Sequence, residues 1–334
     1  MKFYKILFFN SMIFGSLMAI SSFSWFSMWM GLEINLLSII PLFKSVNNLY
    51  PNEASIKYFI TQTIASSIIL MAIILYLNLN NVISMNYNMS LNIMMNSGFL
   101  IKMGAAPFHI WFPEVMEGLN WNMNMLMLTW QKIAPMILLM NNIKINMFIS
   151  MIIISSSMIS GIQGINQISM RKILTYSSIN HIGWMISSMM FSSSIWTLYF
   201  CVYTLISINI ILILKDLNIY YLKQLFNKMN HNKMIKILFS FNFLSLGGIP
   251  PFLGFLPKWL TINFLIMNNM YMLSTVLILF TLITLYFYIR ISINSMILYS
   301  SEKLNKIYKL NKLTIFINFI SIMALIMCNI LINF

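Results

Sequence analysis

The chain has 334 residues, of which 60% are hydrophobic and only 8% are charged, and its mean hydropathy is +0.83. Soluble domains carry about a quarter charged residues, so this composition excludes a soluble globular fold. The formal net charge of +14 would allow a nucleic-acid partner, but the basic residues lie in short loops between apolar segments and no folded domain presents them.

Apolar segments of membrane-spanning length recur along the whole chain. A helix needs about 20 apolar residues to cross the hydrocarbon core of a bilayer. Eleven segments reach or approach that length, at residues 4–22, 25–43, 54–77, 91–107, 121–140, 145–163, 172–191, 194–214, 235–257, 270–290 and 313–333. The sequence therefore predicts an all-α polytopic membrane protein whose single transmembrane domain covers residues 1–334.

The lysines and arginines of the loops predict how these spans are oriented. When the loops are numbered alternately, nearly all of their basic residues fall on one side of the membrane, and only Lys144 and Lys258 fall on the other. Basic loops mark the inner side of a membrane under the positive-inside rule. We therefore expect the N-terminus on the basic side and the C-terminus on the opposite side.

Two features interrupt the regular pattern of spans. Residues 107–118 are aromatic, bounded by prolines and acidic, which favours a short helix lying at the membrane surface. Prolines and glycines predict helix breaks within two spans, because proline lacks an amide donor and clashes with the preceding turn. The predicted breaks lie at Pro135 in the fifth span and at Gly247, Gly248, Pro250 and Pro251 in the ninth. In transporters broken helices form ion sites, although a packing kink is the alternative for each.

Among the charged residues within or directly beside the predicted spans, four stand apart: Glu33, Lys102, Lys132 and Lys258. A charge at the centre of a bilayer costs about 2.5 to 3.5 kcal/mol on insertion scales, so such residues face the interior of a helix bundle. Lysine suits proton transfer because its protonation responds to burial and to nearby carboxylates. We interpret the four residues as a proton path in which Glu33 and Lys102 control the next lysine. Structural ion pairs are the alternative.

Glu53, Lys57 and His181 are possible relay or support residues. Glu53 and Lys57 are four residues apart at the start of the third span. A helical ion pair, or a lysine that extends to the membrane surface, explains them as well as proton transfer does. His181 is the only histidine within a predicted span, and it is either a proton relay or a hydrogen-bonded core residue.

The sequence offers little for redox or nucleotide chemistry. Its two cysteines, Cys201 and Cys328, are too few for an iron–sulfur cluster, and one histidine within the spans cannot supply two axial ligands to a haem. No glycine-rich phosphate loop precedes a helix, and no nucleophile lies beside a base in a local motif. We therefore expect this chain to bind no redox cofactor and no metal.

Six stretches of the sequence carry a resemblance to a known family. They lie at residues 29–41, 53–67, 100–121, 128–135, 167–185 and 242–259, and include WMGLEINLLSIIP and NFLSLGGIPPFLGFLPKW. In this order they resemble the chain 2 family of mitochondrial NADH:ubiquinone oxidoreductase, respiratory complex I, most nearly in its insect form. The resemblance implies an antiporter-like subunit with two inverted five-helix repeats. Glu33, Lys102, Lys132 and Lys258 match charged residues of that family.

The resemblance implies a core membrane-arm subunit that translocates protons across the inner mitochondrial membrane. NADH, FMN, iron–sulfur clusters and ubiquinone would bind in other complex I subunits, and membrane-arm and accessory subunits would be the partners of this chain. The 32 methionines agree with a mitochondrial gene, in which ATA codes for methionine. We further expect an N-terminus on the matrix side, a C-terminus on the intermembrane-space side, and basic loops that hold cardiolipin or another phospholipid.

Two other functions stay open on the sequence alone. A free-standing cation/proton antiporter would use the same buried charges for exchange, and a passive scaffold would use them to assemble neighbouring subunits. Transport measurements distinguish these alternatives. An antiporter exchanges ions when it is alone in a vesicle, whereas charge-neutral variants of a scaffold pump normally once the complex is assembled.

Overall fold

The computed structural model describes residues 3–44, 49–79, 85–143, 147–229, 233–297, 316 and 318. Within these ranges all regular secondary structure is α-helical, apart from one isolated antiparallel bridge between Ser169 and Tyr221. The predicted all-α class is confirmed. The last predicted span, 313–333, lies outside the described residues except for positions 316 and 318.

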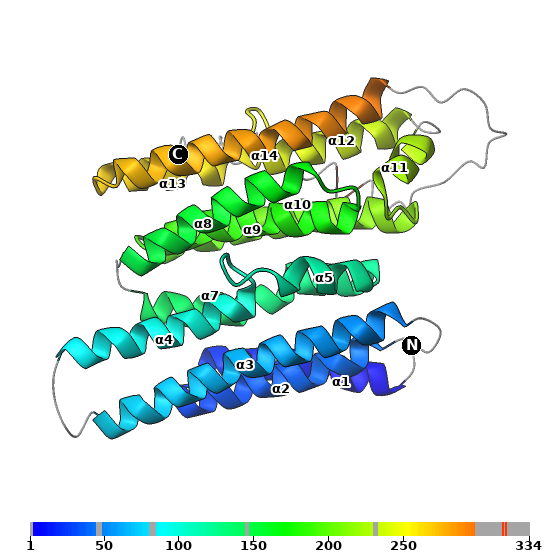
Figure 1. The fold of residues 1–334 in the computed structure, drawn as a ribbon. Helices are drawn as coiled ribbons and strands as arrows, with labels where there is room; N and C mark the ends of the chain where they lie inside the picture. Colours follow the sequence, from blue (N-terminus) through cyan, green and yellow to red (C-terminus); the bar gives the residue numbers. More distant parts are fainter. Residues whose placement is uncertain are drawn as a thin grey trace. The chain divides into compact units, whose positions relative to one another are not determined.

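Residues 1–152 form one compact unit, drawn in blue to green in Figure 1. Its helices are α1 (Phe3–Ser21), α2 (Trp25–Phe43), α3 (Tyr50–Leu79), α4 (Met85–Met103), α5 (Trp111–Gly118), α6 (Trp121–Leu128) and α7 (Trp130–Asn142). Here α1 packs along α2, α3 packs along α4 and α5, and α7 contacts α1 and α4. A Cβ atom on Gly31 would lie 2.6 Å from the Ala19 amide nitrogen, so the close approach of α2 to α1 requires glycine there.

Residues 153–334 form the second compact unit. Its helices are α8 (Met147–Ile165), which begins just before the boundary, α9 (Met170–Met189), α10 (Ser193–Asp216), α11 (Leu222–Met229), α12 (Lys233–Gly247), α13 (Phe255–Met267) and α14 (Tyr271–Ile297). Helix α9 is the core of this unit, because nearly all of its side chains are buried and α10, α13 and α14 pack against it.

Six of the described helices, α1, α2, α3, α8, α10 and α14, are long and apolar enough to cross a membrane. The other predicted spans that the structure describes are either more polar than these six helices or divided into two shorter helices. Helices α4 and α9 carry buried polar side chains, among them Asn96, Lys102, Asn180 and His181. Membrane helices can be polar or broken where protein covers them, so hydropathy alone misses such segments.

The fifth predicted span is divided at Thr129, which separates α6 from α7, and the predicted interruption at Pro135 is wrong. The Met125 carbonyl accepts both the Thr129 amide at 3.1 Å and the Thr129 hydroxyl at 2.7 Å. Pro135 lies inside α7, in the second turn after the break. There it removes only one helical hydrogen bond, with the Gln131 carbonyl, so the new helix continues through it.

The predicted break in the ninth span is confirmed, but the predicted end of that span is too early. Helix α12 ends at Gly247, and α13 resumes at Phe255 and continues to Met267, ten residues beyond the predicted end at 257. Lys258 is therefore the fourth residue of the second half-helix and does not lie at the end of a span. The predicted end is too early because the charge of Lys258 interrupts the apolar pattern, although its side chain is buried.

The two units repeat the same helix pattern at a spacing of 144 residues. Helix α1 covers residues 3–21 and α8 covers residues 147–165, so both of their ends are displaced by that number. The connection after α4 begins GAAPF at Gly104, and the connection after α12 begins GIPPF at Gly248. These glycines have φ of +72° and +77°, a left-handed conformation that favours glycine. In both connections the residue after the glycine donates its amide to the carbonyl five residues earlier, at 3.0 and 3.4 Å.

This repeat changes the interpretation of residues 107–118. The short helix predicted there is present as α5, and α5 starts 144 residues before α13. Thus α4 and α5 are the two halves of a broken helix, as α12 and α13 are. The placement of α5 at the membrane surface stays a prediction.

Candidate functional site

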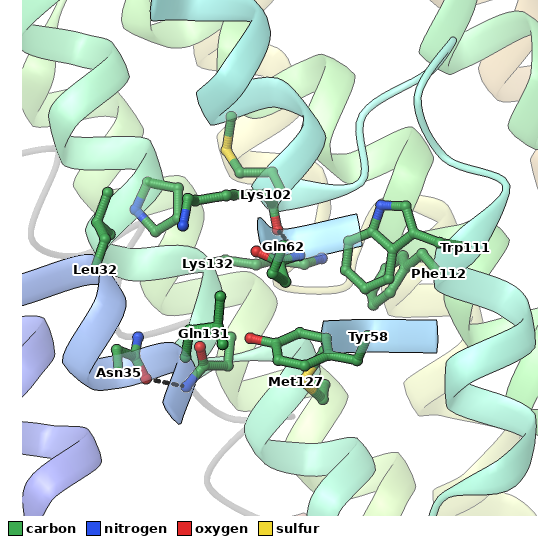
Figure 2. A pocket seen from close by; sticks show the side chains of 13 residues that line it. Leu32, Asn35, Tyr58, Gln62, Lys102, Trp111, Phe112, Met127, Gln131 and Lys132 are labelled. Carbon is green, nitrogen blue, oxygen red and sulfur yellow. Dashed lines mark hydrogen bonds between the residues drawn. The ribbon is translucent and has the colours of Figure 1, made fainter. Parts of the chain in front are cut away.

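A small cavity in the first unit gathers polar side chains from several helices. It is lined from α2, α3, α4, α6 and α7 and by the first residues of α5, as Figure 2 shows. Its volume is about 20 Å³, which leaves room for roughly one ordered water. The polar residues that line it are Asn35, Tyr58, Gln62, Lys102, Gln131 and Lys132.

Glu33 lies on α2, one residue from the cavity-lining Leu32. Its side chain is half-buried, and its Oε1 atom is buried and accepts no hydrogen bond in the described part of the chain. Its charge acts on both Lys102 and Tyr58 through space. The described residues contain no ion pair within 4 Å between Glu33 and Lys102. The predicted pair is therefore a coupling at a distance and not a salt bridge.

Lys102 lies at the end of α4, one residue before the helix stops at Met103. The left-handed Gly104 ends the helix there, so the buried lysine lies among the last carbonyls of the helix, where the helix dipole favours a cation. The amide nitrogen of Gln62 lies 3.5 Å from the Lys102 carbonyl oxygen and joins α3 to this helix end. The break in the helix therefore positions the lysine.

Lys132 is the third residue of α7 and is only 2% exposed. Its ammonium group lies 5.5 Å from the centroid of the Phe112 ring on α5, within the range of a cation–π interaction. Its neighbour Gln131 donates a hydrogen bond of 3.0 Å to Asn35 on α2, drawn as a dashed line in Figure 2. This bond ties the start of α7 to the helix that carries Glu33.

Lys258 occupies a different environment in the second unit. It is buried, and its ammonium group donates hydrogen bonds to the carbonyls of Leu246 at 3.2 Å and Gly247 at 2.8 Å. These carbonyls belong to the last turn of α12, which the break leaves without helical amide donors. Lys258 therefore caps the first half of the broken helix from the first turn of the second half.

His181 is buried in α9 and connects it to α10. Its Nδ1 atom lies 3.0 Å from the hydroxyl oxygen of Tyr199, and its ring centroid lies 5.0 Å from that of Tyr203. The adjacent Asn180 donates a hydrogen bond of 3.2 Å to Thr284 on α14. This geometry fits a proton relay and a hydrogen-bonded core residue equally, so both interpretations of His181 remain.

Glu53 and Lys57 form the predicted helical ion pair, at 2.9 Å. Lys57 also binds Glu114 of α5 at 2.9 Å, a contact that the sequence prediction missed. The three side chains are between 42% and 65% exposed, and ion pairs of such exposure contribute little to stability. The 144-residue repeat is the signal that could have drawn attention to Glu114, because Glu114 and Lys258 are equivalent positions of the repeat.

Two fully buried asparagines were also missed. Asn124 on α6 and Asn209 on α10 are 0% exposed, and neither amide atom of either side chain has a hydrogen-bond partner within the described residues. An asparagine in the middle of an apolar segment was the available signal. In the described part of the chain, no three His, Cys, Asp or Glu side chains are placed to hold a metal ion together.

Membrane-length helices, buried lysines and helix breaks beside those lysines together define an antiporter-like polytopic membrane protein. The chain belongs to the NADH:quinone oxidoreductase/Mrp antiporter membrane family, whose sequence pattern matches residues 21–284. NADH-ubiquinone oxidoreductase chain 2 of Anopheles gambiae is 48% identical over 95% of this chain and 94% of the relative. The protein of the same name from Locusta migratoria is 43% identical over 96% and 94%. The resemblance to insect complex I chain 2 is confirmed.

Solved structures share the fold at low sequence identity. A chain of respiratory complex I from Thermus thermophilus has a TM-score of 0.84 and 18% identity, over 97% of this chain and 79% of that chain. A chain of the Mrp complex from Dietzia sp. has a TM-score of 0.72 and 15% identity, over 84% and 58%. The predicted antiporter-like fold is confirmed.

Proposed function

We propose that this chain is a core membrane-arm subunit of respiratory complex I and carries protons across the inner mitochondrial membrane. Other subunits, which bind NADH, FMN, iron–sulfur clusters and ubiquinone, supply the energy by reducing quinone. The observation that carries the proposal is the placement of Lys102 and Lys132 around one small polar cavity, with Glu33 in electrostatic range of Lys102. Similarity to insect chain 2 proteins over nearly the whole length supports it.

The cavity provides a short proton route between two lysines. Coulombic attraction falls with distance, so movement of Glu33 relative to Lys102 changes how firmly Lys102 holds its proton. When that hold weakens, the proton leaves Lys102 through a cavity water and binds the neutral amine of Lys132. Lys102 is then the amine and Lys132 the ammonium, which the Phe112 ring stabilises from 5.5 Å.

Lys258 continues the path in the second unit. Its ammonium group is held by two backbone carbonyls, and loss of the proton turns two charge-assisted hydrogen bonds into weaker neutral ones. The side chain can then leave the helix break to collect another proton. His181 with Tyr199 is a candidate relay inside this unit, and Glu53 supports Lys57, whose ion pair with Glu114 joins α3 to α5.

The assignment is tested with Lys132→Met and Glu33→Gln in the assembled complex, reconstituted in vesicles. Removal of a proton-transfer group lowers the rate of its step by about a hundredfold, so we expect proton pumping to fall severely in Lys132→Met. Glu33→Gln keeps the side-chain size and removes the charge, so it also lowers pumping. Lys223→Gln, on the exposed side of α11, is the matched control for loss of a charge. Unchanged quinone reduction and pumping in both variants would exclude the assignment.

A free-standing cation/proton antiporter is the second candidate, because the family pattern and the Dietzia likeness include Mrp antiporter chains. Native gel electrophoresis of solubilised membranes separates the two functions. Migration with the whole complex supports the first. Migration of the chain alone, together with sodium-for-proton exchange in vesicles, supports the second.

We also propose that the chain is one multi-pass domain of eleven spans with its N-terminus in the matrix and its C-terminus in the intermembrane space. The accumulation of basic residues in alternate loops supports this orientation. Proteolysis of intact mitoplasts with terminus-specific antibodies tests it, since an N-terminus that is cleaved from the outside would reverse the topology. The same basic loops would hold cardiolipin or another phospholipid.

A further inference from the structure

A second cavity lies in the unit of residues 153–334 and includes neither Lys258 nor His181 in its lining. It is enclosed by the end of α8, the connection to α9, helix α11 and the last part of α14. Its volume is about 250 Å³, compared with about 20 Å³ for the cavity beside Lys102 and Lys132. The second cavity therefore has room for a group much larger than a single water.

The walls of this cavity combine an apolar surface with hydrogen-bonding groups. Phe226, Phe287 and Ile291 provide the apolar part, while Gln167 and Asn294 provide amides. Pockets that bind organic ligands have this composition, in which apolar walls give contact area and a few polar groups orient the ligand.

Arg290 supplies a positive charge at this cavity. Its side chain is exposed and makes no hydrogen bond or ion pair with the described residues. Other cations at the same end are held by protein groups. Arg171 lies over the Tyr220 ring at 4.8 Å, and Lys228 donates to the Leu217 carbonyl at 2.7 Å. A guanidinium group is always protonated and matches the geometry of phosphate oxygens.

The described part of this unit is strongly basic. Among the described residues of this unit Asp216 is the only acidic side chain. Lys172 lies in the first turn of α9, Lys215 near the end of α10, and Lys223 on α11. The N-terminus of α9, whose residue Ile173 lines the cavity, adds the positive end of a helix dipole. An anion is thus favoured over a neutral ligand.

If α14 crosses the membrane, its length places the cavity near the headgroup layer. From Tyr271 to Arg290, α14 advances about 28 Å at 1.5 Å per residue, close to the thickness of the hydrocarbon core. Helix α11, which Figure 1 shows at one end of this unit, buries Leu225 and Met229 and exposes Lys223. Short amphipathic helices with a basic face lie among lipid headgroups.

We propose that this cavity binds the phosphodiester of an anionic phospholipid, with the phosphate on Arg290 and an acyl chain along Phe287 and Ile291. The amides of Gln167 and Asn294 contact the remaining headgroup oxygens. The inference assigns a particular site to the lipid binding proposed above and rests on the membrane placement of the chain, not on proton transfer.

The test uses the assembled complex, stripped of lipid and incubated with photoreactive phosphatidylglycerol or photoreactive phosphatidylcholine. We expect phosphatidylglycerol to label residues 164–168 and 287–294 several-fold more than phosphatidylcholine does. Arg290→Gln should lower this labelling by about tenfold, the effect of losing one charge-assisted hydrogen bond. Lys44→Gln removes the same charge from an exposed side chain of the first unit that does not line the cavity, and it should leave the labelling nearly unchanged.

Three results would overturn the proposal. Equal labelling by the two lipids would remove the preference for an anionic headgroup. Displacement of the label by inorganic phosphate alone would indicate a free-anion site. A density map of the wild-type complex with a neighbouring subunit's segment in the cavity would identify a protein occupant, and this map decides the question even if Arg290→Gln does not assemble. Lost labelling with normal pumping would leave the proton-transfer proposal intact.

Discussion

The two units place buried lysines beside broken helices, but they surround those lysines with different groups. Lys102 lies in the field of the Glu33 carboxylate, and Lys132 lies over an aromatic ring. Lys258 donates instead to two backbone carbonyls at the break that precedes it. A carboxylate can change rotamer, whereas a carbonyl in a helix end cannot. The first unit therefore has an adjustable electrostatic partner, and the second has a fixed one.

The same position of the repeat carries opposite charges in the two units. Glu114 precedes Lys258 by 144 residues, and both lie in the first turn of the second half-helix. Glu114 binds Lys57 at 2.9 Å near the surface, whereas Lys258 is buried against carbonyls. The repeated backbone thus fixes where a charged side chain can lie, and the side chain determines what that position does.

The largest effect is expected from Lys258→Met. The substitution keeps an apolar chain of similar length but removes the ammonium group that donates to the Leu246 and Gly247 carbonyls. We expect pumping by the reconstituted complex to fall by about a hundredfold, more than in Glu33→Gln, which leaves every lysine in place.

Leu256→Met is the matched control for Lys258→Met, because Leu256 is also buried in the first turn of α13. It should pump normally. If Lys258→Met assembled and pumped at the control rate, Lys258 would act only as a helix cap. The difference between the lysine environments of the two units would then have no effect on pumping.

Alanine substitution of Gly104 and of Gly248 should show that the two connections differ in their effect on pumping. Both glycines are left-handed, a conformation that costs other residues about 1–2 kcal/mol. A Cβ atom on Gly248 would also lie 2.8 Å from the Lys258 side chain, whereas one on Gly104 would approach Phe112 no closer than 3.2 Å. Gly248→Ala should therefore lower both the thermal stability and the pumping of the complex, and Gly104→Ala mainly the stability. Equal pumping losses would contradict this difference.

A smaller effect is expected from Tyr199→Phe, which keeps the ring and removes the hydroxyl 3.0 Å from His181. If this bond is part of a relay, pumping falls several-fold while assembly is retained. Tyr221→Phe, at an exposed loop position, is the control. If pumping is unchanged and only stability falls, by about 1 kcal/mol for one hydrogen bond, His181 is a core residue.

Much of the fold and part of the site follow from the sequence. The ends of α1 and α2 agree with the predicted spans within about one residue, because apolar length sets a membrane helix. The break at Thr129 could not be predicted from composition, since it depends on how α6 meets its neighbours, and Pro135 was the more obvious candidate. The separation of Glu33 from Lys102 likewise depends on helix packing. The contact between Lys57 and Glu114 joins residues 57 positions apart, which local spacing cannot reveal.

The smallest effect is expected from the surface cluster of Glu53, Lys57 and Glu114. Each carboxylate binds Lys57 at 2.9 Å, so Glu114→Gln leaves Lys57 with Glu53 as a partner, and the exposed cluster contributes little in any case. We expect Glu114→Gln to pump normally and to show only slightly faster hydrogen exchange in α5.

The double variant Glu53→Gln with Glu114→Gln tests whether the two carboxylates substitute for each other. It should speed hydrogen exchange in α5 by more than the sum of the two single variants, because Lys57 then loses both partners. Glu117→Gln is the control for loss of a charge on the same helix. Glu114 is equivalent in the repeat to Lys258, so its backbone position matches that of a residue proposed for proton transfer. A large loss of pumping in Glu114→Gln alone would contradict this prediction. It would indicate that the proton path of the first unit runs through this cluster and not through the buried cavity.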